Sequence, residues 1–340
     1  MEAKSCGMGI EVVSPFELKA ASLMGFDAQQ TLVNGPQKHR WLGNERRPLN
    51  VVFDSLTEIS LLRNTARAAQ WRVGLRIAVA NQADPDTPEY PAQFGLDPAD
   101  VDAAIALLND AQVHVNVVHF HLRSNVPSLS EYRTAATEVA ATCERCQIGP
   151  EILDIGGGLR EEMIGASELA PSLAFDLEDY VYAVADCAAE FNSVREIWLE
   201  NGRYLASASG ILIITVCDIK RIRGYRFLIC DGGRTNHALE SDWASHAVVP
   251  LRTIKDKRQV EPTIICGPTC MAYDWIYRGS FPSEIQPGDR LAYLNAGAYH
   301  LPWETRFSYG LCKVVWTDDG TNLKVIRAAE TFDHWISQWN

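Results

Sequence analysis

The chain has 340 residues, 47% hydrophobic and 22% charged, a composition typical of a globular enzyme with one large domain and a smaller one. Its formal net charge of −12 argues against a nucleic-acid partner or an anionic membrane. The sequence contains no secretory signal and no apolar run long enough to span a bilayer, so a cytoplasmic protein is predicted.

The first 200 residues or so alternate between short apolar runs and helical patterns. Seven runs are predicted to be strands: residues 10–14, 31–34, 49–54, 72–79, 115–122, 151–155 and 196–200. The helices between them include one that opens at Ser14 and Pro15, and others over residues 56–69, 98–110, 129–144 and 177–191. This alternation indicates a parallel sheet covered by helices. A (β/α)8-type barrel that is one strand short is favoured, with a doubly wound open sheet as the alternative.

After about Leu205 the pattern changes to short strands punctuated by turns. They are predicted over residues 210–222, 225–230, 263–266, 290–294, 310–317 and 323–328. We therefore expect a barrel domain over residues 1–205 and a C-terminal all-β domain over residues 206–340.

Two successive strand ends carry groups suited to a phosphorylated ligand. Residues 151–155 run into Gly156, Gly157 and Gly158, which allow close approach of backbone N–H groups to an anion. The next strand leads to Glu200, Gly202 and Arg203. Arginine suits a phosphate and a buried carboxylate suits a ring nitrogen, so a phosphorylated, nitrogen-containing cofactor is indicated. A plain strand-to-helix turn is the alternative for the glycines.

The histidines and cysteines give no clear sign of a metal. His119 and His121 alternate along a predicted strand, but no third ligand lies at a usual spacing. One imidazole lying flat on an aromatic ring is the preferred interpretation, and a core histidine with satisfied hydrogen bonds is the alternative. Cys143 and Cys146 lie in a helical pattern with no second pair nearby, so ordinary thiols are expected. No metal site is predicted.

Taken together, these motifs resemble the pyridoxal-phosphate-dependent decarboxylases of the ornithine, diaminopimelate and arginine decarboxylase family, whose fold is an alanine-racemase-like barrel plus a β-domain. The resemblance extends from about Gly7 to Gly310. It rests on residues 9–18, 33–38, 53–55, 93–96, 119–124, 154–158, 200–203, 231–233, 267–270 and 297–299.

The resemblance implies pyridoxal 5'-phosphate as the cofactor and a role for each matched residue. His121 would stack on the pyridine ring and Glu200 would pair with its protonated nitrogen. The phosphate would be held by the glycine run, the strand end after Glu200 and two further side chains: Ser124, Gly156, Gly157, Gly158, Gly202, Arg203 and Tyr299. Cys270 would protonate the substrate carbon from the other subunit of a homodimer with shared active sites.

The sequence departs from the family pattern at its start. The family's Schiff-base lysine lies on the first barrel strand, upstream of the position of Gly7, and this sequence has no residue that matches it. A coding start placed too far downstream, a segment supplied by another polypeptide, and a noncatalytic descendant are the three explanations. The function predicted is decarboxylation of an amino acid, and the alternative is an inactive homologue that acts as a binding or regulatory partner.

Further departures concern the substrate. Met271 follows Cys270 where decarboxylases of basic amino acids place an acidic residue, and an apolar side chain cannot pair with an ammonium group. Arg123 and Arg234 are possible partners of an anionic group, while Asp242 is a possible amine contact. We therefore expect a small-molecule or carrier-bound amino acid whose far end is not a free amine, in a specialised biosynthetic pathway.

Overall fold

The computed structural model describes residues 2–82, 92–160, 176–236 and 246–339. Within this part of the chain two compact units form, one of residues 2–160 and 176–201 and the other from residue 202 onward. In the described residues no helix has the length and apolar character needed to cross a membrane.

The first unit is built on a sheet of seven parallel strands that follow one another in sequence order. The strands are β1 (Ile10–Val12), β2 (Thr31–Val33), β3 (Asn50–Phe53), β4 (Arg72–Arg76), β5 (Val115–His119), β6 (Ile152–Asp154) and β7 (Glu196–Trp198). All seven correspond to predicted strands. A doubly wound sheet would reverse its order at a switch point, so that alternative is wrong.

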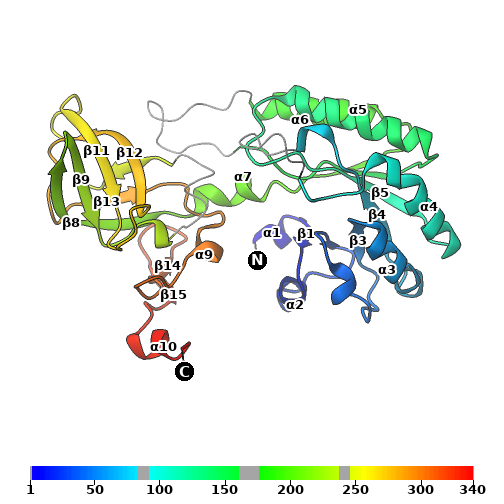
Figure 1. Cartoon of the computed structure of the whole chain (residues 1–340), viewed down its shortest axis with the longest axis horizontal. Coiled ribbons are helices and arrows are strands. Elements are labelled where there is room, and N and C mark those ends of the chain that lie inside the picture. The colour runs from blue at the N-terminus through cyan, green and yellow to red at the C-terminus, as the bar shows by residue number, and fades with distance from the viewer. Residues whose placement is uncertain (1, 83–91, 161–175, 237–245, 340) are drawn as a thin grey trace. The chain divides into compact units, whose positions relative to one another are not determined.

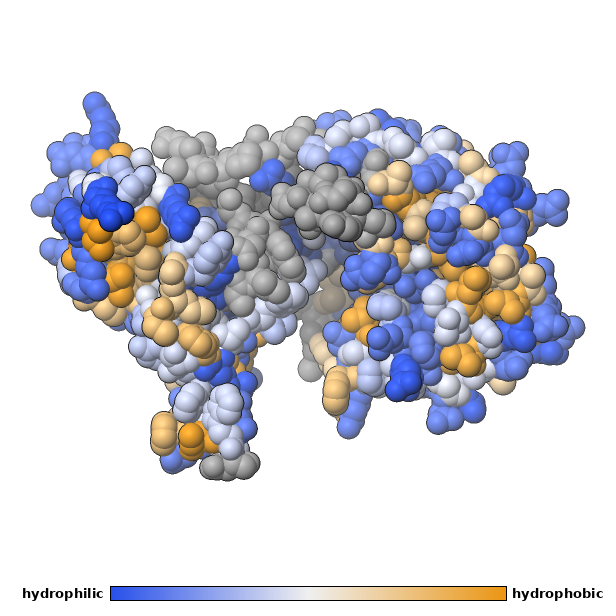
Figure 2. Space-filling view, viewed as in Figure 1, coloured by the Kyte–Doolittle hydropathy of each residue, from blue (hydrophilic) through white to orange (hydrophobic). Residues whose placement is uncertain are grey.

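Helices lie on the outside of these strands (Figure 1). They are α1 (Glu2–Ser5), α2 (Pro15–Leu23), α3 (Leu56–Ala68), α4 (Val101–Asp110), α5 (Leu129–Arg145) and α6 (Leu177–Ala189). The space-filling view shows mostly hydrophilic residues over this surface, with hydrophobic ones scattered among them (Figure 2). An amphipathic helix produces this distribution, because its apolar stripe faces the sheet.

Close packing of neighbouring strands explains one glycine in the sheet. A Cβ at Gly74 in β4 would lie 2.8 Å from Val52 Cγ2 and 2.9 Å from Val117 Cβ. Val52 belongs to β3 and Val117 to β5, and both are fully buried. The two valines therefore fill the space that a side chain on the middle strand would need.

The start of α3 is stabilised by a side-chain cap. Ser55 is the N-cap, and its Oγ accepts a hydrogen bond from the N–H of Glu58 at 3.3 Å. Replacing Ser55 with alanine leaves that N–H without its acceptor and is expected to cost about 1 kcal/mol of unfolding free energy. Urea denaturation measures the loss. Ser60→Ala, at an exposed position of the same helix, is the control and should cost nothing; equal stability of both variants would contradict the capping role.

The second unit contains a six-stranded sheet in the order β10-β13-β8-β9-β11-β12 and a separate β14-β15 pair. The strands are β8 (Leu212–Ile222), β9 (Tyr225–Cys230), β10 (Val248–Pro250), β11 (Val260–Cys266), β12 (Trp275–Pro282), β13 (Arg290–Tyr293), β14 (Val314–Trp316) and β15 (Lys324–Arg327). Pairing is antiparallel except between β9 and β11. Its core includes Ile214, Leu228, Ile265 and Leu291.

The two units together confirm the predicted fold class, a barrel-type α/β sheet with an all-β unit after it. The sequence prediction missed β10 and β12, along with the short helices α1, α7 (Gly202–Ala206), α9 (His300–Trp303) and α10 (Phe332–Ile336). The strand predicted over residues 115–122 ends at His119, so His121 follows it rather than belonging to it.

Candidate active site

Four polar side chains from different strand ends meet in the first unit. Asn34 follows β2, His119 ends β5, Asp154 ends β6 and Glu200 follows β7. Asn34 Nδ2 donates a hydrogen bond to Glu200 Oε1 at 3.0 Å. His119 Nδ1 lies 3.1 Å from Asp154 Oδ2 and 3.8 Å from Glu200 Oε1. We refer to His119, Asp154 and Glu200 as the carboxylate cluster.

Burial dominates the electrostatics of this cluster. His119 and Asp154 are fully buried, and the Glu200 side chain is only 14% exposed. Loss of solvation raises the pKa of Asp154 to about 7. Burial and the nearby Asp154 carboxyl raise the pKa of Glu200 well above its ordinary value. Burial also lowers the pKa of His119 to about 4, so its imidazole is neutral at pH 7 and supplies no positive charge.

The cluster is therefore short of positive charge and of hydrogen-bond donors. Among the described residues, neither ring nitrogen of His119 nor Oδ2 of Asp154 has a hydrogen-bond partner. Arg76, itself mostly buried, is the cation whose charge acts on both carboxyls. A cationic group of a ligand placed beside Glu200 would be stabilised by these carboxyls.

The raised pKa of Asp154 makes the unfolding free energy depend on pH. The folded chain binds this proton more tightly than the unfolded chain, so the stabilisation is full below about pH 4 and is lost as pH rises toward 7. In Asp154→Asn the free energy of unfolding is expected to fall less steeply as pH rises, with a slope smaller by up to about 1.4 kcal/mol per pH unit. Urea unfolding of the cofactor-free chain between pH 4.5 and 7 measures it. The exposed Asp110→Asn is the control, and parallel curves for wild type and Asp154→Asn would refute the assignment.

The imidazole of His121 is held by the glycine run. The N–H of Gly157 donates to His121 Nδ1 at 3.0 Å, so the proton of the neutral ring is on Nε2. Burial lowers the pKa of His121 to about 3, which keeps the ring neutral. A Cβ at Gly156 would lie 2.5 Å from His121 Nδ1 and one at Gly158 would lie 2.4 Å from the Arg123 carbonyl oxygen. Both glycines also have positive φ, a backbone conformation that residues with a side chain rarely adopt. Larger residues are therefore excluded both by the lack of space and by the backbone conformation.

The glycine N–H groups are not all available to an anion. Gly156 donates to Asp154 Oδ1 at 2.9 Å and Gly157 donates to His121. The N–H of Gly158 has no acceptor in the part of the chain that the structure describes. Two of the three glycines thus orient His121 and Asp154, and the N–H of Gly158 is the one that neither of these side chains uses.

The other predicted residues fall into three groups. Ser124 is exposed just beyond His121, and Arg123 forms an ion pair with Glu131 of α5, with Nη1 and Oε2 2.7 Å apart. In the second unit, the guanidinium of Arg203 lies over the ring of Tyr299, 4.9 Å from its centroid, and Gly202 begins α7. Cys270 and Met271 are exposed on the loop between β11 and β12, and Asp242 lies outside the described residues.

Asn34 and Asp154 were not predicted from the sequence as members of the site. The prediction that the chain has no metal site rested only on the spacing of candidate ligands along the sequence. The donor atoms of the carboxylate cluster all lie within 4.8 Å of one another, a geometry that a metal ion can also occupy. Spacing along the sequence does not reveal this geometry, because the two carboxylates come from adjacent parallel strands and join His119 only in the folded chain. The available signal was position, since Asn34, Asp154 and Glu200 each lie within the last two residues of a predicted strand.

Comparison with known proteins matches this chain to a family of enzymes over most of its length. Residues 2–207 match the pyridoxal binding domain of pyridoxal-dependent decarboxylases. A diaminopimelate decarboxylase from Deinococcus radiodurans is 30% identical over 98% of this chain and 84% of its own length. An L-glutamyl-(BtrI acyl-carrier protein) decarboxylase from Niallia circulans is 26% identical over 87% of this chain and 73% of its own length.

Solved structures agree on the fold. Diaminopimelate decarboxylase from Helicobacter pylori, complexed with L-lysine, superposes with a TM-score of 0.82 over 99% of this chain and 85% of its own, at 21% identity. The fold and the matches define an enzyme of the pyridoxal-phosphate-dependent carboxy-lyase class. The chain belongs to the ornithine, diaminopimelate and arginine decarboxylase family, and it is a decarboxylase of amino acids that uses pyridoxal 5'-phosphate.

The site fits this cofactor. The pyridine nitrogen of pyridoxal 5'-phosphate carries a proton, and so a positive charge, when a carboxylate lies beside it. The carboxylate cluster is short of positive charge, so the two are complementary. The neutral ring of His121, fixed by Gly157, presents an apolar face of the kind on which an aromatic ring stacks.

Proposed function

We propose that Glu200 receives the protonated pyridine nitrogen of the cofactor and that His121 stacks on its ring. The observation that carries this proposal is the burial of the Glu200 carboxyl beside Asp154, with Asn34 fixing its Oε1. When bound, the cationic ring supplies an acceptor for the electron pair released as the bond between Cα and the carboxylate breaks. Glu200 keeps that ring cationic, because its own charge is stabilised only while a cation is adjacent.

Phosphate binding is proposed for two sets of groups, each described within its own unit. In the first unit these are the N–H of Gly158 and the hydroxyl of Ser124, with Gly156 and Gly157 shaping the turn. In the second unit, Arg203 and Tyr299 present a guanidinium and a phenol close together, and Gly202 precedes them at the start of α7. A guanidinium is a strong partner for phosphate oxygens, which supports this role.

Cys270 is proposed as the proton donor to the substrate carbon, acting from the partner subunit of a homodimer. Its exposure on the loop between β11 and β12 supports a role outside the core, where four of the nine cysteines lie buried. His121 remains neutral and orients the ring from one face, so it is not the source of that proton.

The substrate proposed is an amino acid conjugated at its far end, such as a carrier-bound one in a specialised pathway. Met271 is 36% exposed beside Cys270 and cannot neutralise an ammonium group. Arg123 is already paired with Glu131, which weakens the case for a free distal carboxylate as its partner. The similarity to a relative named for a carrier-protein substrate supports the conjugated class.

A substrate panel tests this proposal directly. Release of carbon dioxide is measured with meso-diaminopimelate, L-ornithine, L-glutamate and a γ-L-glutamyl thioester of N-acetylcysteamine, each with added pyridoxal 5'-phosphate. The thioester should have the highest kcat/KM. A higher kcat/KM for diaminopimelate or ornithine would contradict the proposal, and no turnover by a chain that binds the cofactor would favour the noncatalytic alternative.

Met271 is expected to control the preference between these substrates. Met271→Glu introduces a carboxylate for a distal ammonium and should raise kcat/KM for ornithine or diaminopimelate relative to the thioester by about tenfold or more. Met271→Gln is the matched control, because it adds polarity without charge. The preference is measured by competition between the two substrates, and an equal effect of both variants would show that charge at this position is irrelevant.

A further inference from the structure

The loop that carries Cys270 is organised around one buried carboxylate. Asp274 ends this loop, residues 267–274, and is only 3% exposed. Its Oδ2 accepts hydrogen bonds from both the N–H of Thr269 at 3.0 Å and the Thr269 hydroxyl at 2.6 Å. Its Oδ1 accepts from the N–H of Arg234, on a different loop, at 2.7 Å. Both oxygens are therefore used.

Backbone bonds close the same loop. The N–H of Gly267 donates to the Asp274 carbonyl at 2.8 Å, and the N–H of Asp274 donates to the Met271 carbonyl at 3.0 Å. The Thr269 hydroxyl also accepts from the N–H of Met271 at 3.3 Å. Cys270 thus lies between two residues, Thr269 and Met271, that are both tied to Asp274.

Two glycines make room for this carboxylate. A Cβ at Gly233 would lie 2.3 Å from Asp274 Oδ1, and a Cβ at Gly267 would lie 2.4 Å from the same atom. Any side chain at either position would displace the carboxylate. The position of the Asp274 carboxylate therefore requires glycine at both positions. Through its hydrogen bond with the N–H of Arg234, Asp274 joins the loop after β9 to the loop before β12.

We infer that Asp274 is a positioning residue, which fixes the Cys270 thiol and the Met271 side chain in the orientation that the reaction uses. This inference rests on the proposed function for the role of Cys270 as proton donor. Asp274 does not touch the substrate in this account. It acts through Thr269 and the backbone, and it holds the proton donor and the residue beside it as one rigid turn.

A spin label on Cys270 tests the positioning itself, without any substrate. In the full chain, the other exposed thiols, Cys6 and Cys217, are changed to serine, and attachment of a nitroxide to Cys270 is confirmed by peptide mass. Asp274→Asn should shorten the rotational correlation time of the label by about threefold or more, since the amide cannot accept all three hydrogen bonds. Unchanged mobility would overturn the inference.

Two further variants keep this test decisive. Thr269→Val removes only the hydrogen bonds of the hydroxyl group and should shorten the correlation time by a smaller amount. If Asp274→Asn does not fold, the mobility of the label in Thr269→Val shows by itself whether these bonds fix the loop. Asp289→Asn is the matched control in the same unit, because Asp289 also accepts a backbone N–H, from Gln286, and pairs with Arg252. It should leave the label unchanged, and an equal effect of Asp289→Asn would mean that the change is not specific to this loop.

A double-mutant cycle separates this inference from the function proposed for Cys270. With the panel substrate that is turned over fastest, Asp274→Asn should lower kcat by about tenfold or more in wild type but less than about twofold in Cys270→Ala. Equal losses in both backgrounds would show that Asp274 does not act through Cys270. Full activity of Cys270→Ala would instead refute the role of the thiol, while the spin-label result would still decide whether Asp274 fixes the loop.

Discussion

Replacing Glu200 with glutamine is expected to lower kcat of decarboxylation by about two to three orders of magnitude. The amide keeps the shape of the side chain and can still accept from Asn34, which donates to Oε1 at 3.0 Å in the wild type. It carries no charge, so it cannot keep the pyridine nitrogen protonated. Affinity for the cofactor should fall as well, and fluorescence titration with pyridoxal 5'-phosphate measures that loss beside the release of carbon dioxide.

The matched control for this variant lies on the same strand. Glu196 begins β7, is exposed, and accepts a hydrogen bond from the indole N–H of Trp198 at 2.8 Å. Glu196→Gln should change neither kcat nor cofactor affinity by more than about twofold, as for most surface substitutions. A Glu200→Gln enzyme with wild-type kcat would show that the charge of Glu200 is not used.

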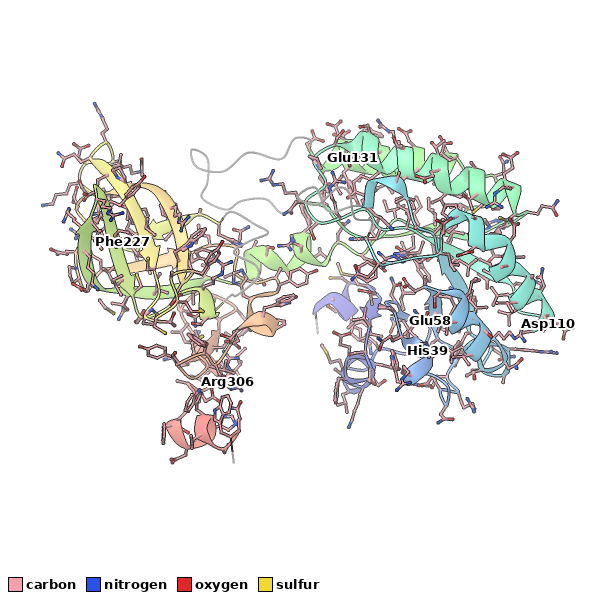
Figure 3. The ribbon with its side chains drawn as sticks, in the orientation of Figure 1. His39, Glu58, Asp110, Glu131, Phe227 and Arg306 are labelled. Atoms are coloured by element: carbon pink, nitrogen blue, oxygen red, sulfur yellow. The ribbon has the colours of Figure 1, made fainter. Side chains whose placement is uncertain are left out.

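Replacing Glu58 with glutamine is expected to have the largest effect on stability, about 3–5 kcal/mol of unfolding free energy. Glu58, labelled on α3 in Figure 3, is 1% exposed and forms an ion pair with the Nζ of the fully buried Lys38 at 2.7 Å. Its carboxylate also accepts from the N–H groups of Lys38 and Asp54, at 2.7 and 3.0 Å. The amide would leave a buried ammonium without its counter-charge.

The loss should also depend on pH in a defined direction. Burial already lowers the pKa of Lys38, and removing Glu58 takes away the larger of the two carboxylate charges, Glu58 and Asp54, that oppose this shift. The folded variant then favours the neutral amine, so its stability falls as pH decreases from alkaline values, and the deficit is larger at pH 6 than at pH 10.

A surface pair provides the comparison for this experiment. Asp110, also labelled in Figure 3, pairs with Arg63 at 3.1 Å, and its side chain is 71% exposed. Asp110→Asn should cost less than about 1 kcal/mol, because exposed ion pairs contribute little. Urea unfolding at both pH values measures the two variants together. A Glu58→Gln chain as stable as Asp110→Asn would refute the structural role of the buried pair.

The regular elements of the first unit were predictable because their signals are local. Apolar runs gave all seven strands, and the serine before α2 marked a helix start that the structure confirms through its cap hydrogen bond. The second unit was harder. Strand β10 has three residues, and β12 contains Gly279 and Arg278, which interrupt the alternation that predicts a strand.

The geometry of the site depends on contacts between distant residues and was less predictable. Asn34 and Glu200 are 166 positions apart, yet one hydrogen bond joins them. The glycine run was expected to bind phosphate, but the N–H groups of Gly156 and Gly157 serve Asp154 and His121. No pattern in the sequence shows which acceptor a given N–H will find, because that depends on how neighbouring strand ends are placed in three dimensions.

The protonation state of the bound cofactor reports directly on the pairing of Glu200 with the pyridine ring. The nitrogen-15 resonance of pyridoxal 5'-phosphate, labelled in its ring and bound to the full chain, reports whether the pyridine nitrogen carries a proton. The nitrogen is expected to be protonated in the wild type across neutral pH and unprotonated in Glu200→Gln. A nitrogen that is unprotonated in the wild type, or equally protonated in both proteins, would contradict the pairing of Glu200 with the ring.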